Sequence, residues 1–542
     1  MAHEANPGAR PIREGRMSES TDPVAPADEI AAGYAFTGPA LDLGALVWDG
    51  RCLPDRQVRV PLAVLNRHGL VAGATGTGKT KTLQLIAEQL SEAGVPVFLA
   101  DVKGDVSGIS APGVPNDKIH ERAGEVAQEW SAAGCPAEFY SLGGIGPGIP
   151  LRATVTGFGP VLLSKVLQLN QTQEQSLGLI FHYADSKGLE LIDLKDLRAV
   201  VAFLVSDEGK AELKGIGGLS TVTAGVILRA LTAFEQQGAV DFFGEPEFDT
   251  AEFLRTAPDG RGVVSVLELP AVQDKPRLFS TFLMWLLADL YADLPEVGDP
   301  ERPKLVFFFD EAHLLFHDAS KAFLESITQT VRLIRSKGIG VFFVTQTPKD
   351  VPADVLAQLG NRVQHALRAF TPDDAKALKA TVKTFPHSAY DLEELLTRLS
   401  TGEAVITVLD ENGAPTPVAA TRLRAPRSLM GPIDAAGLDR AVTSSPLYAR
   451  YARPIDRESA YEKISAEQAA AEAAAERAAV AAEAEKEGRR AAKPGHGTAR
   501  PEPSLAQQVV GSGLFRSLAR SVGTQLGREI SRSLFGTARR RR

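Results

Sequence analysis

The chain has 542 residues, of which 44% are hydrophobic and 23% are charged, an ordinary globular composition that excludes a collagen-like or wholly disordered protein. Its apolar runs are far shorter than the ~18 residues that span a bilayer, its N-terminus lacks the apolar region of a signal peptide, and its two cysteines cannot build a disulfide framework. The net charge of −8 argues against a protein that coats nucleic acid with its whole surface. We predict a cytoplasmic protein with a large core.

The order of segments predicts one long folded region. Residues 1–33 are rich in Ala, Pro, Glu and Asp and are predicted to be a disordered leader. Over residues 34–433, short apolar runs alternate with longer helical patterns, which predicts an α/β domain with a mainly parallel sheet. Residues 107–258 within it are predicted to be a mainly helical insertion. The predicted strands are Gly69–Ala72, Val95–Ala100, Val263–Leu267, Leu305–Phe309 and Val341–Val344, with His365–Arg368 as a further candidate.

Four further segments follow this region. Residues 434–458 are an extension, and residues 459–493 are dominated by Ala, Glu, Lys and Arg, which favours an exposed helical spacer over a partner-binding coiled coil. Residues 494–503 are a linker. In residues 504–542, apolar side chains recur at four- or five-residue steps with arginines between them, which predicts a helical, basic and amphipathic tail. That tail has eight arginines and one acid, Glu529, so it can contact an anionic surface although the rest of the chain is acidic.

The strongest motif is a phosphate-binding turn directly after Gly69–Ala72. It matches G-x-x-x-x-G-K-[ST] over its whole length and leads into a helical pattern. Its glycines let backbone N–H groups converge on phosphate oxygens, and the helix N-terminus adds a positive dipole. Lys79 brings a charge to the β- and γ-phosphates, and the Thr80 hydroxyl can reach Mg²⁺. The predicted nucleotide-binding residues are Gly73, Ala74, Thr75, Gly76, Thr77, Gly78, Lys79, Thr80 and Lys81.

Two acids follow the phenylalanine-rich strand Leu305–Phe309. A carboxylate at the carboxyl end of a parallel strand points into the crevice where ligands bind. Asp310 is therefore predicted to hold Mg²⁺, and Glu311 to accept a proton from the attacking water. The alternative is a pair of solvated acids that cap the next helix. His313 and His317 lack the adjacent Glu of a zinc protease motif, so we predict packed or hydrogen-bonding histidines there.

Polar residues also follow two other predicted strands. Gln346 can orient the attacking water or contact the γ-phosphate, with a plain strand-end hydrogen bond as the alternative. Asp101 and Asp105 support either magnesium or an ordinary turn.

Arginines complete the predicted catalytic site. An arginine supplied by a neighbouring subunit stabilises charge in the transition state of phosphoryl transfer. Arg332 and Arg335 precede the strand at Val341 and are our main candidates, while Arg362 and Arg368 lie further along the chain. A surface ion pair is the default alternative for each.

Taken together, these motifs resemble the HerA/FtsK-type motor ATPases, and more closely the bacterial HerA-like ATPases. The resemblance spans about residues 34–433 and implies a RecA-like P-loop core that hydrolyses ATP with Mg²⁺ at subunit boundaries. It also implies a ring of identical subunits, usually a hexamer, with DNA as its track and with Arg332 or Arg335 acting in trans. The stretches that carry it are Asn66–Thr80, Phe98–Asp105, Lys304–Phe316, Val331–Gly338 and Gly360–Pro372.

Two departures from that group limit what the resemblance implies. HerA proteins carry a sizeable N-terminal β-barrel, whereas only about forty ordered residues are expected before Gly73 here, and the helical insertion is long. We therefore do not extend the expectation of a nuclease partner from that group to this chain. We predict an ATP-hydrolysing helicase- or translocase-like motor that acts on DNA. The alternative is a nucleotide-gated scaffold on a membrane surface or on another protein, held at the periphery of the membrane by the basic tail.

Overall fold

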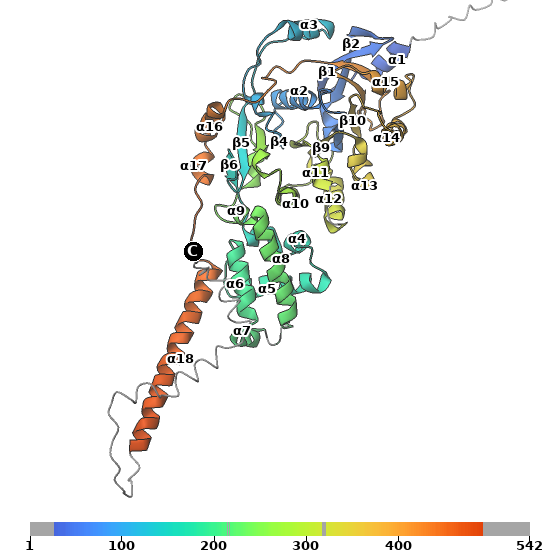
Figure 1. The fold of residues 1–542 in the computed structure, drawn as a ribbon. Helices are drawn as coiled ribbons and strands as arrows, with labels where there is room; N and C mark the ends of the chain where they lie inside the picture. The colour runs from blue at the N-terminus through green and yellow to red at the C-terminus, as the bar shows by residue number, and fades with distance from the viewer. Residues whose placement is uncertain (1–25, 214, 216, 317–320, 492–542) are drawn as a thin grey trace, which may run out of the picture.

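A single large sheet organises the computed structural model, which describes residues 26–213, 215, 217–316 and 321–491 (Figure 1). In this part of the chain the 12 strands are ordered β2-β1-β12-β11-β10-β3-β9-β8-β4-β7-β5-β6. Neighbours from β10 to β6 pair in parallel, and neighbours from β10 to β2 pair antiparallel. The strands are β1 Ala40–Trp48, β2 Arg51–Pro61, β3 Gly69–Ala72, β4 Val97–Asp101, β5 Ala137–Leu142, β6 Ile149–Leu151, β7 Val264–Glu268, β8 Leu305–Phe309, β9 Ile339–Thr345, β10 Asn361–Gln364, β11 Glu403–Thr407 and β12 Ala419–Leu423.

The central parallel strands are buried along their whole length, as strands covered on both faces must be. Every residue of β3, β4, β8 and β9 is buried. Phenylalanines fill the core between neighbouring strands: the ring centroids of Phe308 and Phe342 are 5.2 Å apart, and those of Phe309 and Phe343 are 5.9 Å apart. The mainly parallel α/β architecture predicted from these apolar runs is confirmed.

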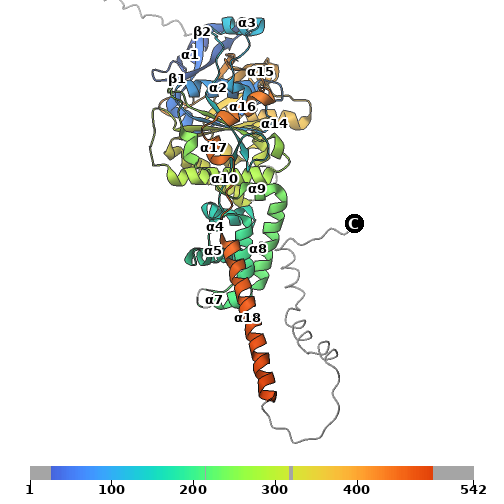
Figure 2. The ribbon, with the colours of Figure 1, turned by 90° about the vertical axis from the view of Figure 1, so that its left-hand side faces the viewer.

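Helices cover the sheet and also form a separate lobe. Figure 1 shows α4, α5, α6, α7 and α8 grouped at one end of the sheet, and the long helix α18 runs from this lobe away from the body. The side view in Figure 2 shows the same projection. The helices are α1 Pro26–Ala32, α2 Lys79–Glu92, α3 Asp117–Glu125, α4 Val155–Val166, α5 Gln171–Ser186, α6 Leu194–Leu204, α7 Asp207–Glu212, α8 Thr221–Phe234, α9 Val240–Phe242, α10 Pro276–Asp293, α11 His313–Phe316, α12 Lys321–Ile334, α13 Ala353–Leu356, α14 Pro372–Val382, α15 Leu392–Arg398, α16 Ala435–Ser444, α17 Tyr448–Tyr451 and α18 Ala460–Ala491.

The ends of the folded region differ from the prediction. Residues 26–33 were predicted to be disordered, but α1 forms there and buries Ala27 and Ile30, which lie three residues apart on one helix face. Residues 1–25 lie outside the described residues. At the other end, α18 is not an exposed spacer throughout, because Ala460 and Ile464 in its first turns are buried. The basic tail, residues 504–542, lies outside the described residues.

Two strands of the sheet lie inside the segment predicted to be a helical insertion. Residues 107–258 include β5 and β6, which extend the parallel sheet beyond β7, and the helices α4 to α9 follow them. Strand β6 contains Pro150, which is tolerated because β6 is the edge strand of the sheet. The candidate strand His365–Arg368 is wrong by a few residues. The strand is β10, and its pairing beside β3 ends with the bond from the His365 N–H to Ala72 O, 2.7 Å long.

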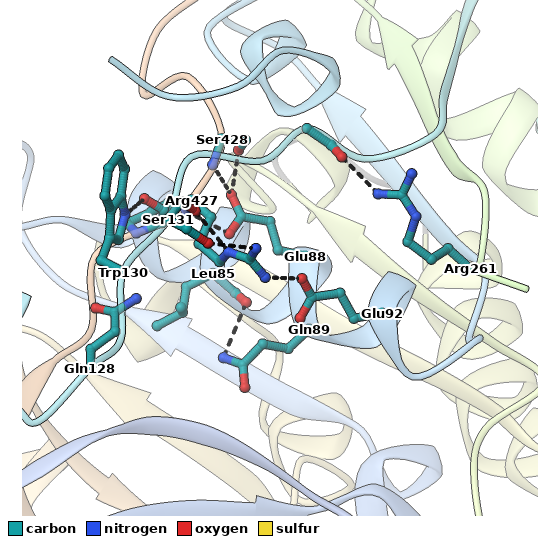
Figure 3. Close-up of polar contacts among 12 residues, drawn as sticks. Leu85, Glu88, Gln89, Glu92, Gln128, Trp130, Ser131, Arg261, Arg427 and Ser428 are labelled. Carbon is teal, nitrogen blue, oxygen red and sulfur yellow. Dashed lines mark hydrogen bonds and ion pairs between the residues drawn. The ribbon is translucent and has the colours of Figure 1, made fainter. Parts of the chain in front are cut away.

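A segment that follows the last strand binds the outside of α2, the helix that begins at the phosphate-binding turn (Figure 3). The buried Glu88 carboxylate of α2 accepts the backbone N–H of Arg427 at 2.8 Å and that of Ser428 at 2.9 Å, together with the Ser428 hydroxyl. Arg427 also pairs with Glu92 one turn further along α2. Trp130 adds a bond from its ring N–H to Pro426 O, 2.8 Å long. Arg427 and Ser428 thereby fix α2, the helix that begins at the turn, to the segment after β12.

We expect Glu88→Ala to destabilise the fold strongly. The change leaves three donors without their acceptor in a site where Glu88 is only 4% exposed, so the free energy of unfolding should fall by about 2–4 kcal/mol. Glu92→Ala is the matched control, because the Glu92 side chain is 43% exposed and its ion pair with Arg427 should contribute about 1 kcal/mol or less. Denaturant unfolding of both variants measures the difference. Equal losses would contradict the role given to Glu88.

Candidate nucleotide-binding site

The glycines of the turn between β3 and α2 adopt backbone conformations that other residues rarely reach. Gly76 has φ 79° and Gly78 has φ 111°, both in the left-handed region. At Gly73 there is no room for a side chain, because a Cβ there would lie 2.4 Å from the Cβ of His365. The sequence pattern of the turn is therefore a requirement of its geometry.

Neighbouring strands fix the turn in place. The Gly73 N–H donates to Thr345 O at the end of β9 (3.2 Å), and the Ala74 N–H donates to Ala366 O just after β10 (2.8 Å). His365 is fully buried beneath the turn, and its Nε2 lies 2.9 Å from the Thr82 hydroxyl of α2. Burial lowers the pKa of His365 to about 4, so its ring is neutral near pH 7. The turn thus rests on the two strands that flank β3.

Lys79 points back into the turn. Its ammonium donates to Gly73 O at 2.7 Å and to Ala74 O at 3.1 Å. Burial lowers its pKa, and the negative charges of Glu311 and Asp310 oppose that effect. Backbone bonds place both segments at one edge of the sheet: the Gly73 N–H donates to Thr345 O, and the Ala312 N–H, directly after the two acids, donates to the adjacent Val344 O at 2.9 Å, with β9 between their strands.

The two acids differ in their surroundings. Asp310 is 3% exposed, and its Oδ2 has no hydrogen-bond partner among the described residues; burial raises its pKa to about 7. Glu311 is 5% exposed and forms an ion pair with Lys103, while its Oε2 lies 3.1 Å from Nδ1 of His313. Burial raises the pKa of Glu311, but the Lys103 ammonium outweighs burial and brings that pKa below its usual value. The backbone of Glu311, shortly before α11, has φ 46°, which is in the left-handed region that residues other than glycine rarely adopt.

A third strand end adds two more carboxylates. Oxygens of Asp101, Asp105 and Asp310 lie within 4.8 Å of one another. Asp101 also shapes the turn after β4, because it accepts backbone N–H groups from Lys103 (3.1 Å) and Val106 (2.8 Å). Both roles predicted for these residues are therefore compatible with the structure. Carboxylate oxygens together with the half-buried Thr80 hydroxyl suit Mg²⁺, and the unpartnered Asp310 Oδ2 is a free ligand atom.

The sequence analysis missed Lys103 and Glu268. Glu268 is the last residue of β7 and is buried beside Asp101, and its burial raises its pKa to about 8 with a contribution from the Asp101 charge. Glu268 directly follows the predicted strand Val263–Leu267, so the strand-end argument used for Asp310 would have found it. No sequence pattern predicts a role for Lys103, because that role depends on its ion pair with Glu311, which lies far away in the sequence.

Gln346 and the candidate arginines do not all line the same cavity. Gln346 and Arg368 line a cavity of about 410 Å³ together with Ala74 and Thr75 of the turn. Arg332 and Arg335 do not line this cavity. Arg335 pairs with Asp299 at 3.1 Å, and the exposed Arg332 lines a groove of about 560 Å³ on α12.

Nδ1 of His313 faces Glu311 as described above, and His317 lies outside the described residues. Arg362 donates to Thr384 O at 3.0 Å.

Comparison with known proteins identifies the family. The profile of the family described as "Helicase HerA-like C-terminal" matches residues 50–542. The chain belongs to this family. The resemblance to HerA/FtsK-type P-loop ATPases is thereby confirmed, and membership makes the protein an ATP-hydrolysing enzyme of the motor type.

Individual relatives in the HerA family are distant. The DNA double-strand break repair helicase HerA of Sulfurisphaera tokodaii is 22% identical over 388 residues, which cover 71% of this chain and 70% of that protein. HerA of Sulfolobus acidocaldarius is 20% identical over 393 residues, with coverage of 71% and 70%.

Solved structures with a similar outline are also distant in sequence. The bacterial conjugative coupling protein TrwB has a TM-score of 0.48 at 16% identity and covers 76% of this chain and 95% of its own. VirB4 of Thermoanaerobacter pseudethanolicus has a TM-score of 0.44 at 15% identity, with coverage of 72% and 98%.

Proposed function

We propose that this HerA-family protein binds Mg·ATP at the turn 73–80, hydrolyses it with Glu311 as general base, and uses the energy to move along DNA as a ring. One observation carries the chemical part: the Lys79 turn and the acids Asp310 and Glu311 meet at the same sheet edge. The match to a helicase family and to HerA proteins supports DNA as the track. It does not favour the alternative of a membrane-surface scaffold.

The residues of the turn would hold the triphosphate. Backbone N–H groups of residues 75–80 would bind the phosphates, since those of Gly73 and Ala74 already donate to the neighbouring strands, and the Lys79 ammonium would exchange the carbonyls of Gly73 and Ala74 for phosphate oxygens. Thr80 and Asp310 would hold Mg²⁺, with Asp105 within reach of the same cation. When bound, Mg²⁺ neutralises charge on the β- and γ-phosphates.

Glu311 would take the proton of the attacking water. Its Lys103 partner occupies one carboxylate oxygen, so we propose that Lys103 turns to the incoming phosphates and frees Glu311 for that water. Lys103 is able to move, because its side chain is 44% exposed. Gln346, beside Ala74 and Thr75, would hold the water or the γ-phosphate.

We propose Arg332, rather than Arg335, as the residue that acts on a neighbour's nucleotide in the ring. Arg335 is engaged by Asp299, whereas Arg332 is exposed on α12 next to Leu333, whose side chain is 38% exposed. An exposed arginine beside an exposed leucine suits a subunit boundary.

Mixing subunits tests the arginine. We expect wild-type protein doped with Arg332→Ala to lose ATPase activity more steeply than in proportion to the fraction of variant, because each altered subunit inactivates its neighbour's site. Pure Arg332→Ala should lose about 10³-fold in kcat. Arg335→Ala is the control. The ATPase activity of its mixtures with wild-type protein should fall in proportion to the fraction of variant, or not at all. A linear decline for Arg332→Ala would argue against action in trans.

ATP turnover measured with and without DNA on an oligomer of known size tests the motor. We expect turnover to rise several-fold with duplex DNA, and the stimulation to fade as salt increases because phosphate contacts are screened. Lys79→Ala should remove both the basal and the stimulated turnover. Basal turnover that DNA does not change would contradict the DNA track while leaving the ATPase intact.

The described part of the chain has no candidate for a membrane-spanning helix, since none is both long and apolar enough.

A further inference from the structure

An open groove separates the long helix α18 from the helical lobe. It has a volume of about 770 Å³ and lies between α18 on one side and α6 and α7 on the other. Apolar side chains, among them Phe203 and Ile464, form part of its lining, and three acids, Glu208, Glu467 and Glu472, lie there together with the neutral Ser465 and Gln468. All lining residues belong to the described part of the chain, and none of them is a lysine or an arginine. The groove is therefore both apolar and acidic.

Basic residues near the groove are already engaged: Lys463, which has no ion pair among the described residues, donates to Gly188 O at 3.0 Å. Lys187 forms an ion pair with Glu212 at 2.7 Å, and Lys195 lies 3.8 Å from Glu462. The lining acids Glu208, Glu467 and Glu472 are all exposed. A cationic ligand would therefore find carboxylates that neighbouring lysines do not already hold.

The walls of the groove are held firmly. Asp196 of α6 is fully buried and accepts the Ser459 hydroxyl at 2.5 Å and the Tyr461 N–H at 2.9 Å at the start of α18. The Ala460 N–H donates to Glu190 O at 3.1 Å. These bonds fix the direction in which α18 leaves the lobe, so the groove is a built feature of the fold.

The chain itself contains a segment with matching chemistry. Residues 504–542 combine a stripe of apolar residues with eight arginines, and their pattern predicts an amphipathic helix. Apolar residues fit the lining around Phe203 and Ile464, and arginines fit the carboxylates. The family match extends to Arg542, so it includes this segment.

The connection is long enough for the segment to return. From Ala475 in the groove, α18 continues to Ala491, which at 1.5 Å per residue carries the chain about 24 Å away. Twelve residues separate Ala491 from Ser504, and a chain of that length spans up to about 40 Å when extended. Residue 504 can therefore reach the groove of its own chain.

We propose that residues 504–542 dock as an amphipathic helix in the groove between α6, α7 and α18 of the same chain. Docking covers the apolar lining and pairs the arginines with Glu208, Glu467 and Glu472. Docked arginines are not available to bind phosphate-bearing polymers or anionic membranes. Such polymers and membranes therefore compete with the groove for the tail.

Disulfide trapping in the full-length chain tests this proposal. Ala475→Cys is combined in turn with a cysteine at Leu514, Leu518, Val522 or Leu526, in a Cys52→Ser background because Cys52 is the more exposed of the two native cysteines. We expect mild oxidation to give an intrachain cross-link for at least one pair, seen as a monomer band with altered mobility and identified by peptide mass. No cross-link at any of the four positions would overturn the proposal.

Two controls separate docking from random collision. Val480→Cys is at an exposed position outside the groove lining and closer to the tether, so a free tail should cross-link there at least as well as at Ala475. Docking predicts at least tenfold less cross-linking at Val480. Changing Glu208, Glu467 and Glu472 to Lys should reduce the Ala475 cross-link at least tenfold. The same change at the exposed Glu121, Glu129 and Glu393 should leave it unaltered.

Two further outcomes would reject the proposal. A cross-link that forms only between chains, seen as a dimer band, would place the tail on a second copy. A tail that binds vesicles containing anionic lipid equally well with the groove acids intact or reversed would show that the groove does not hold it.

Discussion

Lys79→Ala is expected to abolish ATP turnover, with a loss of at least about 10²–10³-fold in kcat/KM. The lysine is buried in the turn with its ammonium held by Gly73 O and Ala74 O, close enough to Asp310 and Glu311 for their charges to raise its pKa against the effect of burial. Its removal takes away the charge that meets the β- and γ-phosphates. Steady-state turnover and binding of a fluorescent ATP analogue measure the effect.

The matched control for this loss is Lys376→Ala. Lys376 is an exposed lysine of α14 whose ion pair with Asp373 is on the surface, so its removal should change turnover less than twofold. Thermal melting shows whether each variant is folded. A folded Lys79→Ala protein with wild-type turnover would place nucleotide chemistry elsewhere in the molecule.

Glu311→Gln is expected to stop hydrolysis while nucleotide still binds. General base catalysis contributes about 10²–10⁴-fold, and an amide of the same shape cannot accept the proton of water. Because Glu311 lies outside the phosphate-binding turn, the affinity for ATP should change by only a few fold. Single-turnover assays with radiolabelled ATP, together with binding measurements, separate the two effects.

An exposed glutamate provides the comparison for Glu311→Gln. Glu296→Gln alters a side chain that is 60% exposed and paired with Lys337, and it should leave turnover within twofold of wild type. If Glu311→Gln lost binding and hydrolysis to the same extent, Glu311 would be a ligand of the nucleotide complex rather than its base.

The strands of the parallel core could be predicted from the sequence, because a strand that is buried on both faces is a continuous run of apolar residues. Leu305–Phe309 and Gly69–Ala72 are continuous apolar runs, and both strands appear with the bounds predicted. The turn after β3 followed from its phosphate-binding motif, and the acids after β8 followed from the rule that ligands bind at the carboxyl ends of parallel strands. The site could therefore be assembled from local sequence together with one topological rule.

The antiparallel flank lacked such a signal. Strand β2 is mostly exposed or half-buried and contains Pro54, Asp55 and Arg56, a pattern typical of a loop. It is a strand because β1 pairs with it over most of its length. Contacts of this kind depend on residues far apart in the chain, as does the Glu88 contact with residue 428, and neither has a local pattern that predicts it.

Strand β3 has consequences for how the protein is made. Its partners are β9 and β10, and Ala72 pairs with Thr345 and Gln364. At a synthesis rate of ~5–20 residues per second, the ribosome makes β3 roughly 14–55 s before the strand that will sit beside it. During that interval both hydrogen-bonding edges of an apolar strand lack their native partners, which is a template for aggregation. A nascent chain that stalls before residue 345 should therefore need a chaperone and should be unable to capture nucleotide.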